Sequence, residues 1–114
     1  MTEEGAVMPT VQDMFNELDA RLKAEPERSR GVNATYQFVI TGEAGGDWFL
    51  TAADGSAYVT KGSAPDPQVT VTMTADDYIG MATGRLSGQE LFFAGRMRVV
   101  GDQFLAMRLG EMTQ

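Results

Sequence analysis

The chain contains no cysteine and no histidine among its 114 residues. Without cysteine there is no disulfide, no thiolate metal ligand and no thiol nucleophile. Without histidine there is no Ser-His-Asp or Cys-His catalytic group, no imidazole ligand for zinc and no imidazole acid–base group. We therefore expect no metal, no cofactor and no enzymatic activity.

Long apolar runs and an excess of basic residues are also missing. No apolar stretch reaches the roughly 18 residues of a membrane-spanning helix, so we expect no integral association with a membrane. The N-terminal segment carries acids where a secretory signal would carry bases, which favours a cytoplasmic protein. The net charge of −7 argues against nucleic acid as a partner, because a phosphate backbone requires a cationic surface.

What remains is an ordinary globular composition, with 43% hydrophobic and 22% charged residues. This length suits one domain, which we place at residues 9–114 behind a flexible tail at 1–8. Apolar residues recur at helical spacing from Val11 to Leu22. Thr10 is the expected N-cap, and Pro26 ends this helix near Ala24.

Four segments of alternating polarity follow the first helix. In the first of them Tyr36, Phe38 and Ile40 share one face. The dipeptide Asp54-Gly55 predicts a tight hairpin turn between the second and third. They predict a largely antiparallel meander with one wet face, and they span residues 33–42, 46–55, 56–62 and 68–74.

The period changes in the second half of the chain. Thr74 is the expected cap of a helix that stops near Gly84, and Ser87 the cap of a short helix at 88–94. A strand at 96–101 and a helix at 102–112 complete the element order α-β-β-β-β-α-α-β-α.

Methionine and phenylalanine dominate this half. Five of the eight methionines lie there, and Leu91, Phe92 and Phe93 stand in succession. Methionines adapt to a cavity for varied apolar ligands, or they fill gaps in a small core. Three consecutive large residues on a helix cover about 200° of arc, so this helix is buried on both sides or faces a cavity or a partner.

Residues 48–112 carry a series of motifs in a fixed order. Trp48 opens a strand, and Asp54-Gly55 follows. Next come PDPQVTVTMT at 65–74 and ADDYIGMATG at 75–84. The most specific segment, GRLSGQELFFAGRMRVVGDQFLAMRLGEM, occupies 84–112. This ordered set resembles the sterol carrier protein family. The positions that fit the family's pattern are Gly84, Arg85, Phe92, Phe93, Gly95, Gly101, Ala106, Met107 and Leu109.

The resemblance implies an α/β (α+β) fold: a five-stranded, largely antiparallel sheet with helices covering one face. It also implies an apolar tunnel between the two layers for fatty acid, fatty acyl-CoA, phospholipid or sterol-like ligands. We expect headgroups near some of Arg85, Arg96, Arg98 and Arg108. The expected lining residues are Trp48, Leu50, Val71, Met73, Ile79, Met81, Leu91, Phe92, Phe93, Phe104, Leu105 and Met112.

The chain departs from the family pattern in two places. Ser87-Gly88-Gln89 stands where Asn-Pro-Gln is common, and the Ser87 cap can compensate for the missing proline. The chain ends without the C-terminal targeting tripeptide of peroxisomal members, so we expect a bacterial or archaeal protein without peroxisomal import.

Two functions from different classes fit these observations. The first is non-catalytic binding, and transfer, of an intracellular lipid. The second is a structural or partner-binding domain of the same fold that has lost lipid transfer and that binds a partner helix or forms a homodimer. A third, an enzyme acting on a lipid intermediate, has no histidine, cysteine or paired acids to support it.

Overall fold

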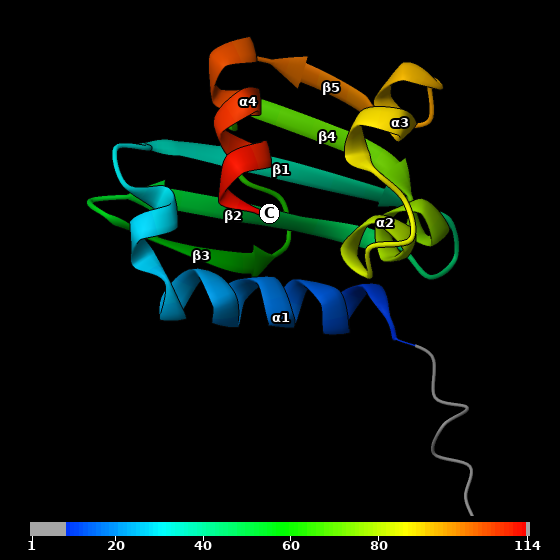
Figure 1. The fold of residues 1–114 in the computed structure, drawn as a ribbon, viewed down its shortest axis with the longest axis horizontal. Coiled ribbons are helices and arrows are strands. Elements are labelled where there is room, and N and C mark those ends of the chain that lie inside the picture. Colours follow the sequence, from blue (N-terminus) through cyan, green and yellow to red (C-terminus); the bar gives the residue numbers. More distant parts are fainter. Residues whose placement is uncertain (1–8, 114) are drawn as a thin grey trace, which may run out of the picture.

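A single mixed sheet carries all the helices on one face (Figure 1). The computed structural model describes residues 9–113, so the tail predicted at 1–8 lies outside the described residues. The predicted order of helices and strands is confirmed, with one unpredicted 3-10 helix, η2. The elements are α1 (Val11–Ala24), η2 (Pro26–Ser29), β1 (Ala34–Thr41), β2 (Gly46–Ala53), β3 (Ser56–Lys61), β4 (Val69–Thr74), α2 (Ala75–Ala82), α3 (Gly88–Phe93), β5 (Arg98–Gly101) and α4 (Gln103–Met112).

The sheet has the order β3-β2-β1-β4-β5. Three of its pairs are antiparallel, and the central pair, β1 with β4, is parallel. The largely antiparallel five-stranded sheet is therefore confirmed. The simple meander is wrong, because β4 does not pair with β3 but crosses to the far side of β1.

Gln37 holds this crossover in place. Its Nε2 donates to the carbonyl oxygens of Trp48 (3.0 Å) and Gly62 (3.1 Å), and its Oε1 accepts from the backbone N–H of Ala64 (2.7 Å). The side chain is buried on the sheet face opposite the helices. The face that we expected to be wet is therefore covered at β1 by the start of the β3–β4 connection.

Helix α1 covers the β3 side of the sheet. It begins with the predicted capping box between Thr10 and Asp13, and its buried residues follow the predicted helical spacing. Asp19 Oδ1 accepts a hydrogen bond of 2.8 Å from the backbone N–H of Val59 in β3. This bond uses a donor that an edge strand would otherwise expose, so α1 protects that edge.

The ring of Phe15 joins α1 to three other elements. It stacks between Trp48 of β2 (4.7 Å between centroids) and Tyr78 of α2 (4.5 Å). Phe38 of β1 meets the same ring edge-on at 5.3 Å. Aromatic pairs in these geometries stabilise a core beyond the area that they bury. The stack fixes α2 relative to α1 and so fixes one wall of the site described next.

Candidate functional site

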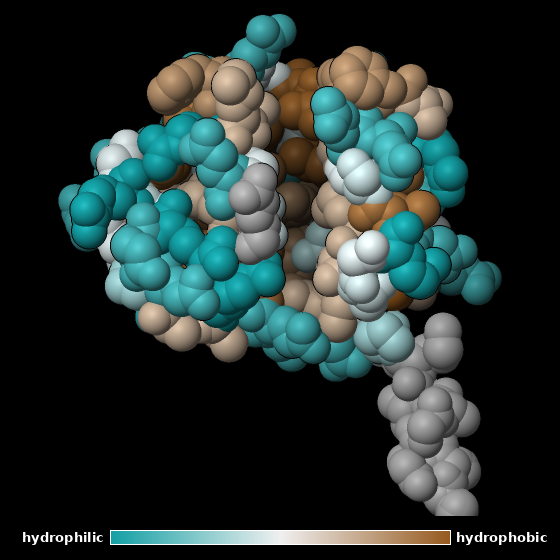
Figure 2. Space-filling model, viewed as in Figure 1, coloured by the Kyte–Doolittle hydropathy of each residue, from teal (hydrophilic) through white to brown (hydrophobic). Residues whose placement is uncertain are grey.

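A cavity of about 470 Å³ lies between the inner face of the sheet and the helical layer. Figure 2 shows the hollow, with hydrophobic residues in its depth and hydrophilic residues on much of its rim. Volumes of about 300–1,000 Å³ with mainly apolar walls are typical of sites for small organic ligands. The larger apolar side chains that line it are Met14, Leu18, Phe38, Val71, Tyr78, Met81, Met97, Val99 and Leu109.

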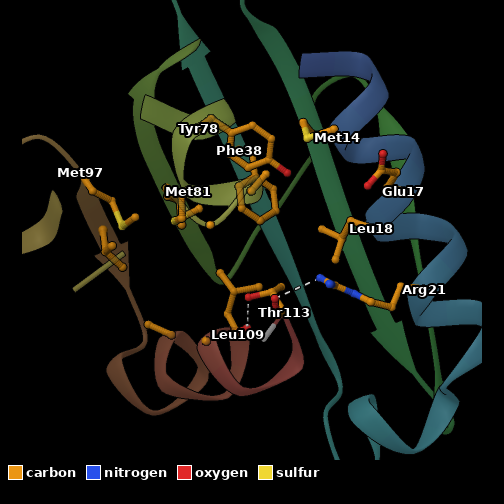
Figure 3. Close-up of a pocket in the computed structure, with 16 residues that line it drawn as sticks. Met14, Glu17, Leu18, Arg21, Phe38, Tyr78, Met81, Met97, Leu109 and Thr113 are labelled. Atoms are coloured by element: carbon orange, nitrogen blue, oxygen red, sulfur yellow. Dashed lines mark hydrogen bonds between the residues drawn. The ribbon is translucent and has the colours of Figure 1, made fainter. Parts of the chain in front are cut away.

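Helix α1 supplies one wall through residues that share a single face. Met14, Glu17, Leu18 and Arg21 all line the cavity, and they stand at the i, i+3, i+4 and i+7 positions of a helix. Figure 3 shows them opposite Tyr78 and Met81 of α2, with Leu109 and Thr113 at the end of the chain closing a third side. Met14 and Leu18 belong to the apolar spacing predicted from Val11 to Leu22, whereas Glu17 and Arg21 were not predicted, although the same helical spacing could have found them.

Arg21 connects the wall formed by α1 to the wall formed by α4 and the residue that follows it. Its guanidinium donates a hydrogen bond of 3.0 Å to the carbonyl oxygen of Thr113, which follows α4. A carbonyl at a helix C-terminus is unsatisfied within the helix, so an arginine is a favourable partner. The cation is thus held at the cavity rather than free on the surface of α1.

Tyr78 is the buried titratable group of the cavity. Only 4% of the residue is exposed, and burial raises the pKa of its hydroxyl far above the ordinary value of 10, although the nearby positive charge of Arg21 lowers it. The phenol is therefore neutral and keeps its proton throughout the physiological range. It can donate a hydrogen bond into a cavity that is otherwise largely apolar.

The structure distributes the predicted lining residues over three environments. Val71 and Met81 line the cavity. Ile79 and Leu105 are partly buried and pack against the core. The remaining aliphatic residues and the tryptophan are buried in the core without lining the cavity: Trp48, Leu50, Met73, Leu91 and Met112.

The three predicted phenylalanines are exposed. Phe92 is 49% exposed, Phe93 77% and Phe104 66%. Of the alternatives for this short helix, burial on both sides is therefore excluded, and an exposed side open to a partner remains. Helix α3 has only six residues, and Leu91 is its single buried one, so no second layer among residues 9–113 covers Phe92 and Phe93.

The four arginines expected near a headgroup do not line the cavity. Arg96 makes a two-pronged hydrogen bond to the buried carboxylate of Asp77, and so joins α2 to the segment after α3. Arg108 donates to the carbonyl oxygen of Arg30. Arg85 and Arg98 are exposed on the surface. The cation at the cavity is Arg21, on an element that the sequence motifs did not single out.

The fold and the cavity together define a small α+β domain built around an apolar chamber. A sequence model of the SCP-2 sterol transfer family matches residues 15–114. The chain belongs to this family. Within the part that the structure describes, no helix is both long and apolar enough to cross a membrane.

Known proteins agree with this assignment. Hydroxysteroid dehydrogenase-like protein 2 of Xenopus tropicalis is 32% identical over 104 residues, which are 90% of this chain but 24% of that protein. The chain therefore spans about a quarter of that relative's length. A solution structure of palmitated sterol carrier protein 2-like 2 from Aedes aegypti gives a TM-score of 0.78 at 25% identity, over 92% of this chain and 95% of that one. The crystal structure of the same mosquito protein gives 0.75 at 25% identity, over 89% and 94% of the two chains.

Proposed function

We propose that this chain binds a lipid non-covalently in its cavity and carries it without catalysing a reaction. The observation that carries the proposal is the cavity itself, whose walls are mainly apolar and come from both layers. Each methylene removed from water contributes about 0.8 kcal/mol, so a medium-length acyl chain supplies enough free energy for binding. The palmitated mosquito relative, with a TM-score of 0.78, supports a fatty acyl ligand.

The titratable lining residues support a binding role over a catalytic one. They are Glu17, Arg21 and Tyr78, and the chain has no histidine or cysteine that could pair with them as base or nucleophile. We expect affinity to rise with acyl chain length until the cavity is full and to depend little on salt, because burial is the main driving force.

A cavity-filling variant tests the proposal. Ala106 lines the cavity from α4, so Ala106→Phe should reduce displacement of a fluorescent fatty acid by at least about tenfold, because the ring occupies the ligand's volume. Gln103→Phe adds the same ring to the exposed side of the same helix and should leave binding unchanged. Mass spectrometry of the purified protein under native and denaturing conditions should also find co-purified lipid. Equal binding by both variants would contradict the proposal.

One observation favours a second candidate, self-association. Strand β5 is an edge of the sheet, Val100 on it is 56% exposed, and the exposed phenylalanines lie on the two helices that flank it in the chain. Open strand edges and apolar patches are common surfaces for pairing with a second copy. A dimer that dissociates on dilution, and that Phe93→Ser abolishes without affecting lipid binding, would support it. A monomer at all concentrations, measured by sedimentation, would remove it.

A further inference from the structure

Tyr78 differs from the other buried polar residues. Its hydroxyl makes no hydrogen bond to any of residues 9–113, although only 4% of the residue is exposed. Every other buried residue with a polar side chain in that range makes a side-chain hydrogen bond: Ser29, Tyr36, Gln37, Trp48 and Asp77. The hydroxyl oxygen itself is not fully buried, because it opens onto the cavity that Tyr78 lines, so a molecule in that cavity can supply its partner.

The direction of this hydroxyl is fixed by packing. The Tyr78 ring is stacked on Phe15 at 4.5 Å and 13° between planes, and Phe38 lies at 6.5 Å on another side. Figure 3 shows the hydroxyl pointing away from α2, toward the wall formed by α1. A donor on a locked ring is pre-organised for a partner at one place, because little side-chain freedom is lost on binding.

The charge near Tyr78 indicates what that partner is. Arg21 lines the same cavity, and its positive charge acts on Tyr78. Because the phenol stays protonated and the guanidinium is a permanent cation, both groups are donors. The complementary group is an oxygen that accepts hydrogen bonds.

We propose that the Tyr78 hydroxyl donates a hydrogen bond to an oxygen atom of the bound lipid, and that the cavity thereby selects amphiphiles with a carboxylate or hydroxyl group over plain hydrocarbons. This inference rests on the proposed lipid-binding function and names the chemical class of its ligand. The Tyr78 hydroxyl faces the α1 wall, on which Glu17 and Arg21 also line the cavity, so the lipid oxygen that it binds lies between α2 and α1.

A pair of matched variants tests the inference. Tyr78→Phe removes the unpartnered oxygen and keeps the stacked ring. Tyr36→Phe makes the same change at a buried tyrosine whose hydroxyl donates to the carbonyl oxygen of Leu105 at 2.9 Å. Dissociation constants for decanoic acid, decanol and decane are measured by displacement of a fluorescent fatty acid from the wild type and both variants.

We expect Tyr78→Phe to weaken binding of the oxygen-bearing ligands by roughly 3- to 10-fold and to leave decane within about twofold. A loss confined to decanoic acid identifies a carboxylate as the partner, and a similar loss for decanol identifies any acceptor oxygen. Tyr36→Phe should leave the ratio between the ligands unchanged. An equal loss for all three ligands, or none, would overturn the inference while the proposed function stands. Failure of the wild type to bind any of the three would overturn both.

Thermal unfolding without ligand provides a second readout. Tyr36→Phe should lower the midpoint, because it removes a protein–protein hydrogen bond. Tyr78→Phe should not, because its hydroxyl has no protein partner to lose. An equal decrease in both variants would mean that a protein group holds the Tyr78 hydroxyl, and would overturn the inference independently of any ligand.

Discussion

The two sides of the cavity bury their apolar residues to very different extents. On the side of α1, Val11, Phe15 and Leu22 are each 1% exposed. On the side of α3 and α4, Phe93 is 77% and Met107 68% exposed. The difference follows from element length and position. Helix α1 has fourteen residues and packs on the sheet and on α2, whereas α3 has six and buries one.

The edges of the sheet differ in the same way. On the first side, α1 covers β3, and Asp19 accepts a hydrogen bond from that strand. On the second side, β5 is four residues long and its pattern contains no fully buried residue. The first side is thus a packed core, whereas the second combines a few buried residues, such as Leu91 and Met112, with one cavity wall and an open apolar surface. We therefore expect substitutions on the first side to cost more stability than substitutions on the second.

The largest expected effect contrasts one phenylalanine from each side. Phe15→Ala should cost about 3–5 kcal/mol of unfolding free energy, because Phe15 is fully buried and stacked between two aromatic rings. Phe93→Ala should cost less than about 0.5 kcal/mol, because the side chain is mostly exposed. Urea unfolding followed by circular dichroism measures both. Similar costs would mean that the second side is packed as tightly as the first.

The second effect concerns the attachment of β5. Gly101 has a φ of +124°, and a Cβ there would lie 2.1 Å from the backbone oxygen of Gln68 in the neighbouring chain segment. Gly101→Ala should therefore cost about 2–4 kcal/mol, through backbone strain and displacement of the β4–β5 pair.

Gly95→Ala is the matched control for this variant. Gly95 also has a positive φ, of +76°, but its Cβ would meet nothing within 4 Å. It should cost only the roughly 1–2 kcal/mol of the left-handed conformation. Chemical denaturation measures both losses of unfolding free energy. Equal losses would show that β5 shifts enough to remove the clash at Gly101 without a further cost in stability.

The sequence predicted the first side better than the second for a physical reason. The stripe of α1, its cap at Thr10 and the turn at Asp54-Gly55 are local features. In the structure Asp54 and Gly55 both have a positive φ, of 55° and 81°, as a tight hairpin turn requires. Local chemistry determines such elements, so the chain alone identifies them.

Long-range placement was not predictable in this way. The parallel pairing of β4 with β1 goes with the hydrogen bond from Ala64 to Gln37, which holds the β3–β4 connection against β1. A periodic pattern of apolar residues carries no information about such a long-range contact. The apolar sequence around Phe92 and Phe93 does not reveal whether another layer of the structure covers these side chains. Of the predicted lining residues only Val71 and Met81 line the cavity, because lining and core residues have the same composition and differ only in packing.

A smaller effect appears at alkaline pH. Burial raises the pKa of both Tyr78 and Tyr36 in the folded protein above the value of about 10 expected in the unfolded chain. Above pH 10 the unfolded state releases these protons while the folded state keeps them, so stability is complete below pH 10 and falls as pH rises. The slope is at most about 1.4 kcal/mol per pH unit for each tyrosine.

The two tyrosines report on different sides of the molecule. Tyr78 stacks on Phe15 of α1, and Tyr36 donates to Leu105 of α4. Urea unfolding at about pH 9, 10 and 11 should give a shallower loss of stability in Tyr78→Phe than in the wild type. A slope unchanged by Tyr78→Phe would mean that its hydroxyl ionises in the folded protein as it does in the unfolded chain.

The smallest expected effect is a gain of stability on the second side. Gly110 lies within α4, and an added Cβ would meet nothing within 4 Å. Gly110→Ala should therefore raise stability by about 0.5–1 kcal/mol, because alanine loses less backbone entropy in a helix. Gly80→Ala in α2 is the matched control: its Cβ would lie 2.6 Å from Leu86 Cδ1, so the leucine side chain must move and the gain in stability should be smaller than for Gly110→Ala. Gly110 also lines the cavity, and the single methyl should leave decanoic acid binding within about twofold. If Gly110→Ala instead lowers the midpoint, the added methyl group must clash with a neighbour of α4 that lies more than 4 Å away in this structure. The second side would then be as closely packed as the first.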